Sequence, residues 1–153
     1  MTLQTGLKQQ LYDRCKEIVE QRIRNAKEAM DSAQEAANDE TKSSAGDKYE
    51  TGREMMQQEM ENNAVQLTEA RKLREVLERI NPAKKYDTVQ GGSLVITNNG
   101  SFYISIGLGK ITVDGKDYFA IAPTSPLGAL LMEKKPKEVV EFNGRKFEIE
   151  EVL

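Results

Sequence analysis

The sequence predicts an α+β fold, in which an antiparallel helical hairpin precedes a small antiparallel β domain with one short helix. Three observations predict it. Residues 3–37 and 49–80 repeat apolar side chains every three or four positions, as helices that pack along one seam do. Beyond residue 92 the apolar side chains alternate every two positions, as in strands. Three dipeptides typical of type I′ hairpin turns interrupt this alternation: Asn99-Gly100, Asp114-Gly115 and Asn143-Gly144.

The two helical segments carry seams typical of a coiled coil, with Glu, Lys, Arg and Gln around them. The first seam consists of Leu7, Leu11, Cys15, Val19, Ile23, Ala26, Met30, Ala33 and Ala37. The second consists of Met56, Met60, Ala64, Leu67, Ala70, Leu73, Leu77 and Ile80. Because a short polar stretch, 38–48, joins segments of similar length, we expect them to run antiparallel in one chain. Pro82 cannot continue the second helix. We therefore expect a coiled-coil hairpin over 1–81, a linker over 82–92 and a β domain over 93–153.

The β domain is predicted from short apolar runs between turns. Strands are expected over 94–97, 102–106, 111–113, 118–122, 139–142 and 146–152. Between the fourth and fifth strands, residues 125–132 predict a short helix with Ser125 as its N-cap and Pro126 at its first position.

Composition limits the classes of function. The chain of 153 residues has a net charge of −3, which gives no general attraction to nucleic acid or to an anionic membrane. It has no apolar run near the roughly 20 residues that span a bilayer, and its first residues do not resemble a signal peptide. With no histidine, it lacks histidine-based catalytic pairs and imidazole metal ligands. Cys15, the single cysteine, falls on the seam and is interpreted as a small buried hydrophobe. Because one cysteine cannot form an intramolecular disulfide, a cytoplasmic location is favoured.

The polar stretch at the hairpin tip carries three carboxylates. Asp47 is best explained by the second helix, whose N-terminal dipole favours a negative charge. Asp39 and Glu40 stand where the first helix is expected to end, which is the unfavourable side of a dipole. These two residues are therefore the better candidates for a functional role.

The C-terminal third carries a family resemblance. The helix segment 125–135, with the run Val139-Val140-Glu141-Phe142 and the ending at 147–152, resembles the end of Gre-type bacterial transcription elongation factors. In that family a Ser-Pro-x-x-x-Ala-Leu-x-x-Lys helix precedes a final hairpin in an FKBP-like domain. The predicted hairpin of helices is similar to the family's coiled coil, and the surroundings of Tyr49 resemble the start of its second helix.

The resemblance implies a role without catalysis by the protein itself. Gre-type factors dock on core RNA polymerase and insert the coiled coil into its secondary channel, where tip carboxylates share a Mg²⁺ ion with the polymerase site that cleaves backtracked RNA. The residues implied here for Mg²⁺ are Asp39, Glu40 and Asp47. Those implied for docking are Ser125, Pro126, Leu127 and Leu130; the sequence assigns the two leucines equally well to the core. Three basic residues of the first helix could contact phosphates of the nascent RNA, although nearby acidic residues favour an ordinary solvated helix face; they are Arg22, Arg24 and Lys27.

The tip departs from the family pattern. If Tyr49 is aligned with the family's tyrosine, Lys42 and Ala45 occupy its acidic positions, and neither can bind magnesium. We therefore expect polymerase docking more firmly than transcript cleavage, and a channel binder that does not stimulate cleavage stays open.

Two other functions are kept as alternatives. Phe102, Tyr103, Tyr118 and Phe119 could line a prolyl-peptide pocket of an FKBP-like isomerase or chaperone module, although core packing explains at least half of them. The second alternative is a plain coiled-coil interaction protein. We expect a monomer, and a stable dimer in light scattering would favour this alternative. Neither requires a cofactor or a membrane.

Overall fold

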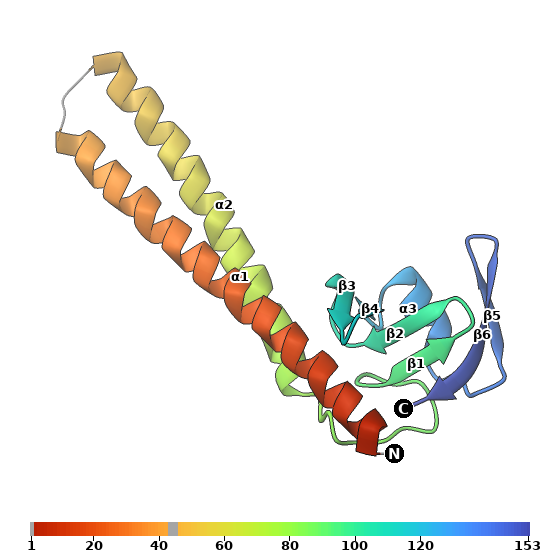
Figure 1. Cartoon of the computed structure of the whole chain (residues 1–153). Coiled ribbons are helices and arrows are strands. Elements are labelled where there is room, and N and C mark those ends of the chain that lie inside the picture. Colours follow the sequence, from red (N-terminus) through yellow and green to blue (C-terminus); the bar gives the residue numbers. More distant parts are fainter. Residues whose placement is uncertain (1, 43–45) are drawn as a thin grey trace. The chain divides into compact units, whose positions relative to one another are not determined.

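The structure is a computed structural model that describes the backbone of residues 2–42 and 46–153 and the side chains of residues 6–36 and 52–153. The described residues form an α+β protein, as predicted (Figure 1). A long N-terminal helical region is followed by a six-stranded sheet. The chain divides into two compact units: Ile18–Arg74, called the helical unit, and Met1–Glu17 with Glu75–Leu153, called the β-rich unit. None of the helices in the described part combines the length and apolar character needed to cross a bilayer.

The helical unit contains most of α1 (Thr2–Lys42) and α2 (Gly46–Glu78), which lie side by side in Figure 1. They run in opposite directions, because Glu20 near the start of this unit pairs with Arg74 near its end, at 3.9 Å between Oε2 and Nη1. The buried apolar side chains all belong to the predicted seams: Val19, Ile23, Ala26, Ala33, Leu67 and Ala70.

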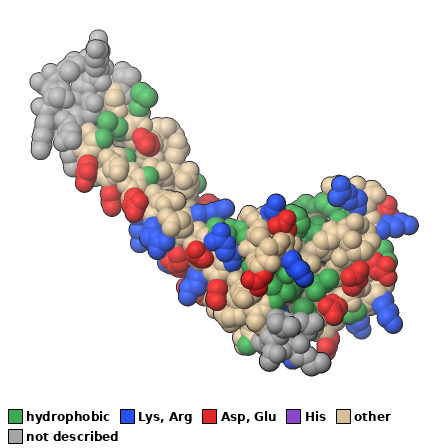
Figure 2. Space-filling view, in the orientation of Figure 1, with side chains coloured by type: hydrophobic (Ala, Val, Ile, Leu, Met, Phe, Trp, Pro, Cys, Tyr) green, Lys and Arg blue, Asp and Glu red, His purple; other side chains and the backbone are tan. Residues whose placement is uncertain are grey.

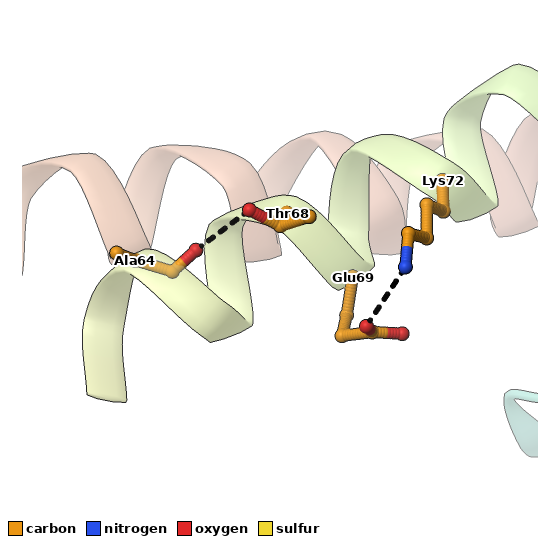
Figure 3. Close-up of polar contacts among 4 residues, drawn as sticks. All are labelled: Ala64, Thr68, Glu69 and Lys72. Carbon is orange, nitrogen blue, oxygen red and sulfur yellow. Dashed lines mark hydrogen bonds and ion pairs between the residues drawn. The ribbon is translucent and has the colours of Figure 1, made fainter. Parts of the chain in front are cut away.

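The outer face of α2 satisfies its polar groups locally (Figure 3). The Thr68 hydroxyl donates to the Ala64 carbonyl at 2.9 Å, and Lys72 lies 3.4 Å from the Glu69 carboxylate. Both members of the ion pair are about two-thirds exposed. Such exposed pairs contribute about 0.3–0.5 kcal/mol on a helix, so burial of the seam, not this pairing, stabilises the unit.

The helices extend further than predicted at their connection. α1 continues to Lys42, beyond its predicted segment, which ends at Ala37, and α2 begins at Gly46, before its predicted segment, which starts at Tyr49. Residues 38–42 contain neither proline nor glycine, and nothing in them stops a helix. Ser43 or Ser44 is a plausible N-cap for the second helix from its residue type, and both lie outside the described residues. At its other end α2 closes with a tight turn, Ile80 N–H to Leu77 O at 3.0 Å, before Pro82.

The sheet has the strand order β3-β4-β2-β1-β6-β5. Its strands are β1 (Leu94–Thr97), β2 (Gly100–Ile104), β3 (Gly109–Val113), β4 (Lys116–Ile121), β5 (Val139–Phe142) and β6 (Arg145–Val152). Each lies within two residues of its predicted bounds. The sheet is mostly antiparallel, as predicted; the exception among its strand pairs is β2 with β4, which run parallel. The chain reverses direction between β2 and β3 and again in the β3–β4 hairpin, so β4 runs in the same direction as β2.

Two of the three predicted type I′ turns are confirmed. Asp114-Gly115 and Asn143-Gly144 have positive φ at both residues, and each closes a two-residue hairpin. The first turn is different: its loop is Asn98-Asn99, both with negative φ, and Gly100 takes φ 120°.

Local hydrogen bonds explain the difference at the first turn. The Thr97 hydroxyl accepts from Asn99 N–H at 3.1 Å and donates to the Gly100 carbonyl at 2.7 Å. The two asparagine side chains bind β6, where Asn98 Oδ1 accepts from Glu148 N–H and Asn99 Nδ2 donates to Lys146 O, both at 2.7 Å. These bonds fix the loop in a conformation that type I′ geometry does not describe.

The core of the β-rich unit lies between the sheet and α3 (Pro126–Leu131). Its buried members are Val89, Val95, Phe102, Ile104, Leu131, Val140, Phe147 and Ile149. Cys15 is fully buried, and burial raises the pKa of its thiol to about 11. The interpretation of Cys15 as a small buried hydrophobe is therefore confirmed.

Candidate docking site

The helix α3 is held in place by Ser125, its predicted N-cap. The Ser125 hydroxyl accepts from Gly128 N–H at 3.1 Å and donates to the Ala122 carbonyl at 2.7 Å. Pro126 occupies the first helical position. A Cβ on Gly128 would lie 2.1 Å from the Ala122 carbonyl oxygen, so only glycine lets the helix approach this backbone. The local sequence thus fixes where α3 sits on its sheet.

Beside α3 the β-rich unit is hollowed by a cavity of about 390 Å³, called here the aromatic hollow. Its apolar lining comes from four strands and the helix: Phe102, Phe119, Leu127, Phe142 and Phe147. Asn99, Asn143 and Arg145 complete the lining. These residues are far apart in sequence, and sheet pairing brings them together.

The aromatic rings of the hollow contact one another. The Phe102 ring lies 5.8 Å from the Phe119 ring and 5.8 Å from the Phe147 ring, the second pair being edge-to-face. Phe102 and Phe147 are buried, whereas Phe119 is 37% exposed. The first two rings therefore belong to the core, and Phe119 offers an accessible aromatic surface to an incoming group.

The polar lining of the hollow is fixed in position but offers little chemistry. Asn99 is anchored on β6, and Asn143 belongs to the tight turn between β5 and β6. Arg145 is the one ionisable side chain in the lining. A guanidinium is always protonated and cannot act as a base. The hollow can therefore bind an apolar or aromatic side chain, but its lining has no group for acid–base or nucleophilic catalysis.

The structure separates the four residues implied for docking. Leu127 is half-buried, packs against the core and lines the hollow. Leu130 is 41% exposed on α3 and does not line it. Ser125 and Pro126 begin the helix, which accounts for both residue types. Docking through these residues stays a prediction.

The four aromatic residues proposed for a prolyl-peptide pocket divide equally. Phe102 and Phe119 line the hollow. Tyr103 and Tyr118 are buried elsewhere, and burial raises the pKa of both hydroxyls. Core packing explains these two tyrosines, which agrees with the expectation for at least half of the set.

The basic residues Arg22, Arg24 and Lys27 all lie exposed on α1. Arg24 donates to the Gln21 side chain at 2.7 Å, and Arg22 lines a groove that also contains Glu69. Figure 2 shows both signs of charge interspersed over the described part of the helical unit. The surroundings are those of a solvated helix face, and RNA contact stays a prediction.

The side chains of Asp39, Glu40 and Asp47 lie outside the described residues. The backbone places the first two in the last turn of α1 and Asp47 second in α2. Among the residues whose side chains are described, no group of three Asp, Glu or Cys side chains could hold a metal ion.

Sequence reasoning missed two features. Phe142 and Phe147 were assigned to strands, but alternation alone cannot tell which face of the sheet will be hollowed. Lys8 is buried, although its type predicts exposure. A signal was present, because Lys8 precedes the seam residues Leu11 and Cys15 by three and seven positions and so shares their helix face.

Comparisons with known proteins assign the chain to no family. No family model matches the chain, and no curated protein is sufficiently similar to it. Its function is therefore proposed from its residues and their geometry.

Proposed function

We propose that the protein is a Gre-like transcription factor, which docks on bacterial RNA polymerase with its β-rich unit and reaches into the secondary channel with α1 and α2 as a coiled coil. The observation that carries the proposal is the aromatic hollow beside α3. The core beneath it is already packed, yet Phe119 and Leu130 remain exposed. An accessible aromatic surface with fixed polar groups around it is suited to bury an apolar anchor of a protein partner.

The helical unit supports the same function. The buried part of its seam includes three small side chains, Ala26, Ala33 and Ala70, so the two helices can approach closely and form a slender pair. Such a unit buries little apolar area, and its surface carries many charges. A slender, hydrophilic pair of helices fits a narrow, water-filled channel.

The chemistry in this proposal belongs to the polymerase. Asp39, Glu40 and Asp47 are the carboxylates of the connection that could add oxygen ligands to a Mg²⁺ ion shared with the polymerase site. Lys42 and Ala45 stand at the acidic positions of the Gre pattern, so modulation of elongation is the primary proposed effect, and stimulation of RNA cleavage is secondary. The factor would need no cofactor of its own.

The test is to measure, by fluorescence anisotropy, how tightly the full chain binds core RNA polymerase from the same organism. We expect Phe119→Asp to weaken the complex at least tenfold, because it places a charge in the hollow. The matched control is Val139→Asp, since Val139 is 54% exposed but does not line the hollow. It should change affinity less than twofold. No complex, or equal losses in the two variants, would refute the docking site.

A second experiment addresses the connection between the helices. In complexes with backtracked RNA, Asp39→Ala and Glu40→Ala should alter pausing or cleavage while leaving polymerase affinity unchanged. If neither variant changes the RNA products, the carboxylates have no role there.

A prolyl-peptide isomerase or chaperone module is the second candidate, with the sheet then serving as an FKBP-like domain. The observation that favours it is again the hollow, whose apolar aromatic lining could hold a proline ring and has no acid or base. The full chain would then accelerate cis–trans exchange of a proline-containing peptide, and Phe119→Asp would abolish the acceleration. A rate equal to the uncatalysed one removes this candidate.

A further inference from the structure

Lys8 is the one buried charged residue among those whose side chains the structure describes. It is 3% exposed, although it lies on α1 near the start of the chain. Its Nζ donates to the Lys84 carbonyl at 2.5 Å and lies 4.7 Å from the centre of the Tyr86 ring. No described carboxylate lies within 4.0 Å of it. The ammonium has three N–H donors, so two lack an acceptor among the described residues.

This ammonium lines a cavity of about 200 Å³ inside the β-rich unit. The other walls are the segment 82–87 and the residues Val152 and Leu153. Lys84 and Lys85 contribute two more positive charges, and Lys84 Nζ lies 5.2 Å from the same Tyr86 ring. Asp87 is the one acidic side chain of the lining. The side chains of the lining thus carry three positive charges against one negative charge.

The local sequence builds the wall that faces Lys8. After α2, the Asn81 carbonyl accepts from Lys84 N–H at 3.1 Å and the Asn81 side chain accepts from Ala83 N–H at 3.0 Å. This turn fixes the Lys84 carbonyl. Gly92, at φ 98°, leaves room for Tyr86, since a Cβ there would lie 3.1 Å from the Tyr86 hydroxyl. The cavity is thus built by a defined backbone rather than by mobile side chains alone.

We propose that this cavity binds a small oxyanion bearing a phosphate group, held by the Lys8 ammonium with Lys84 and Lys85 at the rim. A buried charge is expensive unless it is paired. An anion would accept the two remaining Lys8 donors and offset the repulsion among three lysines. A water molecule occupies roughly 30 Å³ in the liquid, so the cavity has room for a phosphate group and a few waters. The anion can be free phosphate or the phosphate of a monoester.

The charge state of Lys8 fits this role at neutral pH. Burial lowers the pKa of Lys8 from 10.5 to about 8, so the side chain is still mainly protonated at pH 7. Bound phosphate favours the charged form and should raise this pKa. The other titratable side chains of the cavity are Lys84, Lys85, Tyr86 and Asp87.

Calorimetric titration of the full chain tests the site, with inorganic phosphate and phenyl phosphate as probes and acetate for comparison. We expect saturable one-to-one binding of phosphate, at least tenfold weaker in Lys8→Met, because charge-assisted hydrogen bonds are lost. Lys85→Gln should weaken binding two- to fivefold, and Asp87→Asn should strengthen it. The control Lys16→Gln, exposed on the same helix, should have no effect. Stronger binding of phenyl phosphate would identify a monoester ligand, and equal binding would identify phosphate itself.

A second readout needs no substitution at Lys8. In ¹³C NMR of the unmodified protein, saturating phosphate should raise the titration midpoint of the Lys8 Cε signal by at least half a pH unit. Absence of saturable phosphate binding, or a Lys8 midpoint that phosphate leaves unchanged, would overturn the proposal. So would stronger binding of acetate than of phosphate. Polymerase affinity plays no part in either readout.

Discussion

Replacing Lys8 by methionine should stabilise the protein at neutral pH and destabilise it by about 1–2 kcal/mol above about pH 10.5. The pKa of Lys8 falls from 10.5 in the unfolded chain to about 8 in the fold because burial disfavours the charged form. Each unit of difference corresponds to 1.36 kcal/mol, so keeping Lys8 charged at pH 7 costs about 3 kcal/mol of stability. Methionine fills a similar volume without charge. The Lys84 carbonyl loses its partner in the variant, which reduces the expected gain to about 1–2 kcal/mol.

The pH dependence gives the sharper comparison. Between about pH 8 and pH 10.5 the unfolded chain binds a proton at Lys8 that the folded protein has released. The stability of the wild type therefore rises through this interval relative to Lys8→Met, by about 3 kcal/mol. Cys15 works in the opposite direction, since its raised pKa lowers stability from about pH 9 to pH 11. It is present in both proteins, so the difference between them isolates Lys8.

Urea unfolding of both proteins, followed by circular dichroism at pH 7 and pH 10, measures this difference in phosphate-free buffer. Phosphate must be absent, because a ligand of the folded state would stabilise the wild type alone. Lys16→Met is the matched control: Lys16 is exposed, and its substitution should shift stability by less than about 0.5 kcal/mol at either pH. If the difference between wild type and Lys8→Met is the same at pH 7 and pH 10, Lys8 is not buried as described.

Three further predictions concern packing. Gly128→Ala should lower the free energy of unfolding in urea by about 1–3 kcal/mol, because the added Cβ would overlap the Ala122 carbonyl. Gly91 has open space around it, so Gly91→Ala should lower it by less than about 1 kcal/mol. Equal losses in the two variants would contradict this packing. Leu131→Ala should cost about 2–5 kcal/mol in the same assay, whereas the exposed Leu130→Ala should cost less than about 1 kcal/mol. A disulfide reagent at pH 8 should modify Cys15 no faster than local unfolding exposes it, because the thiol is fully buried and its pKa is raised to about 11. Rapid modification of the native protein would show that the thiol is accessible.

Much of the secondary structure could be predicted because its causes lie close together in the chain. The seam of α1 needs only the spacing of residues such as Val19 and Ile23, and both are buried as expected. Ser125-Pro126 predicts the start of α3 through a cap and a fixed φ. Asp114-Gly115 predicts its turn because both residues tolerate positive φ. Each of these preferences acts within a few residues.

The errors arose where distant residues compete with local preferences. Asn99-Gly100 has the composition of a type I′ turn, but hydrogen bonds to β6, about fifty residues away, hold the loop differently. The parallel pairing of β2 with β4 depends on where the β3–β4 hairpin packs, which alternation does not encode. The first helix was predicted to end near Ala37 but continues to Lys42, because polar residues without proline or glycine can remain helical.

The sequence by itself determined that this protein has two long helices with an apolar seam, six short strands and a capped third helix, since periodicity and turn chemistry are properties of neighbouring residues. Only the tertiary structure decided that Phe102, Phe119 and Phe147 share one hollow, and that Lys8 is buried against the carbonyl of Lys84. The physical reason is that a cavity has no local code. It forms where side chains from remote segments fail to fill the space between them, and the backbone pairing that brings those segments together sets its lining and its charge.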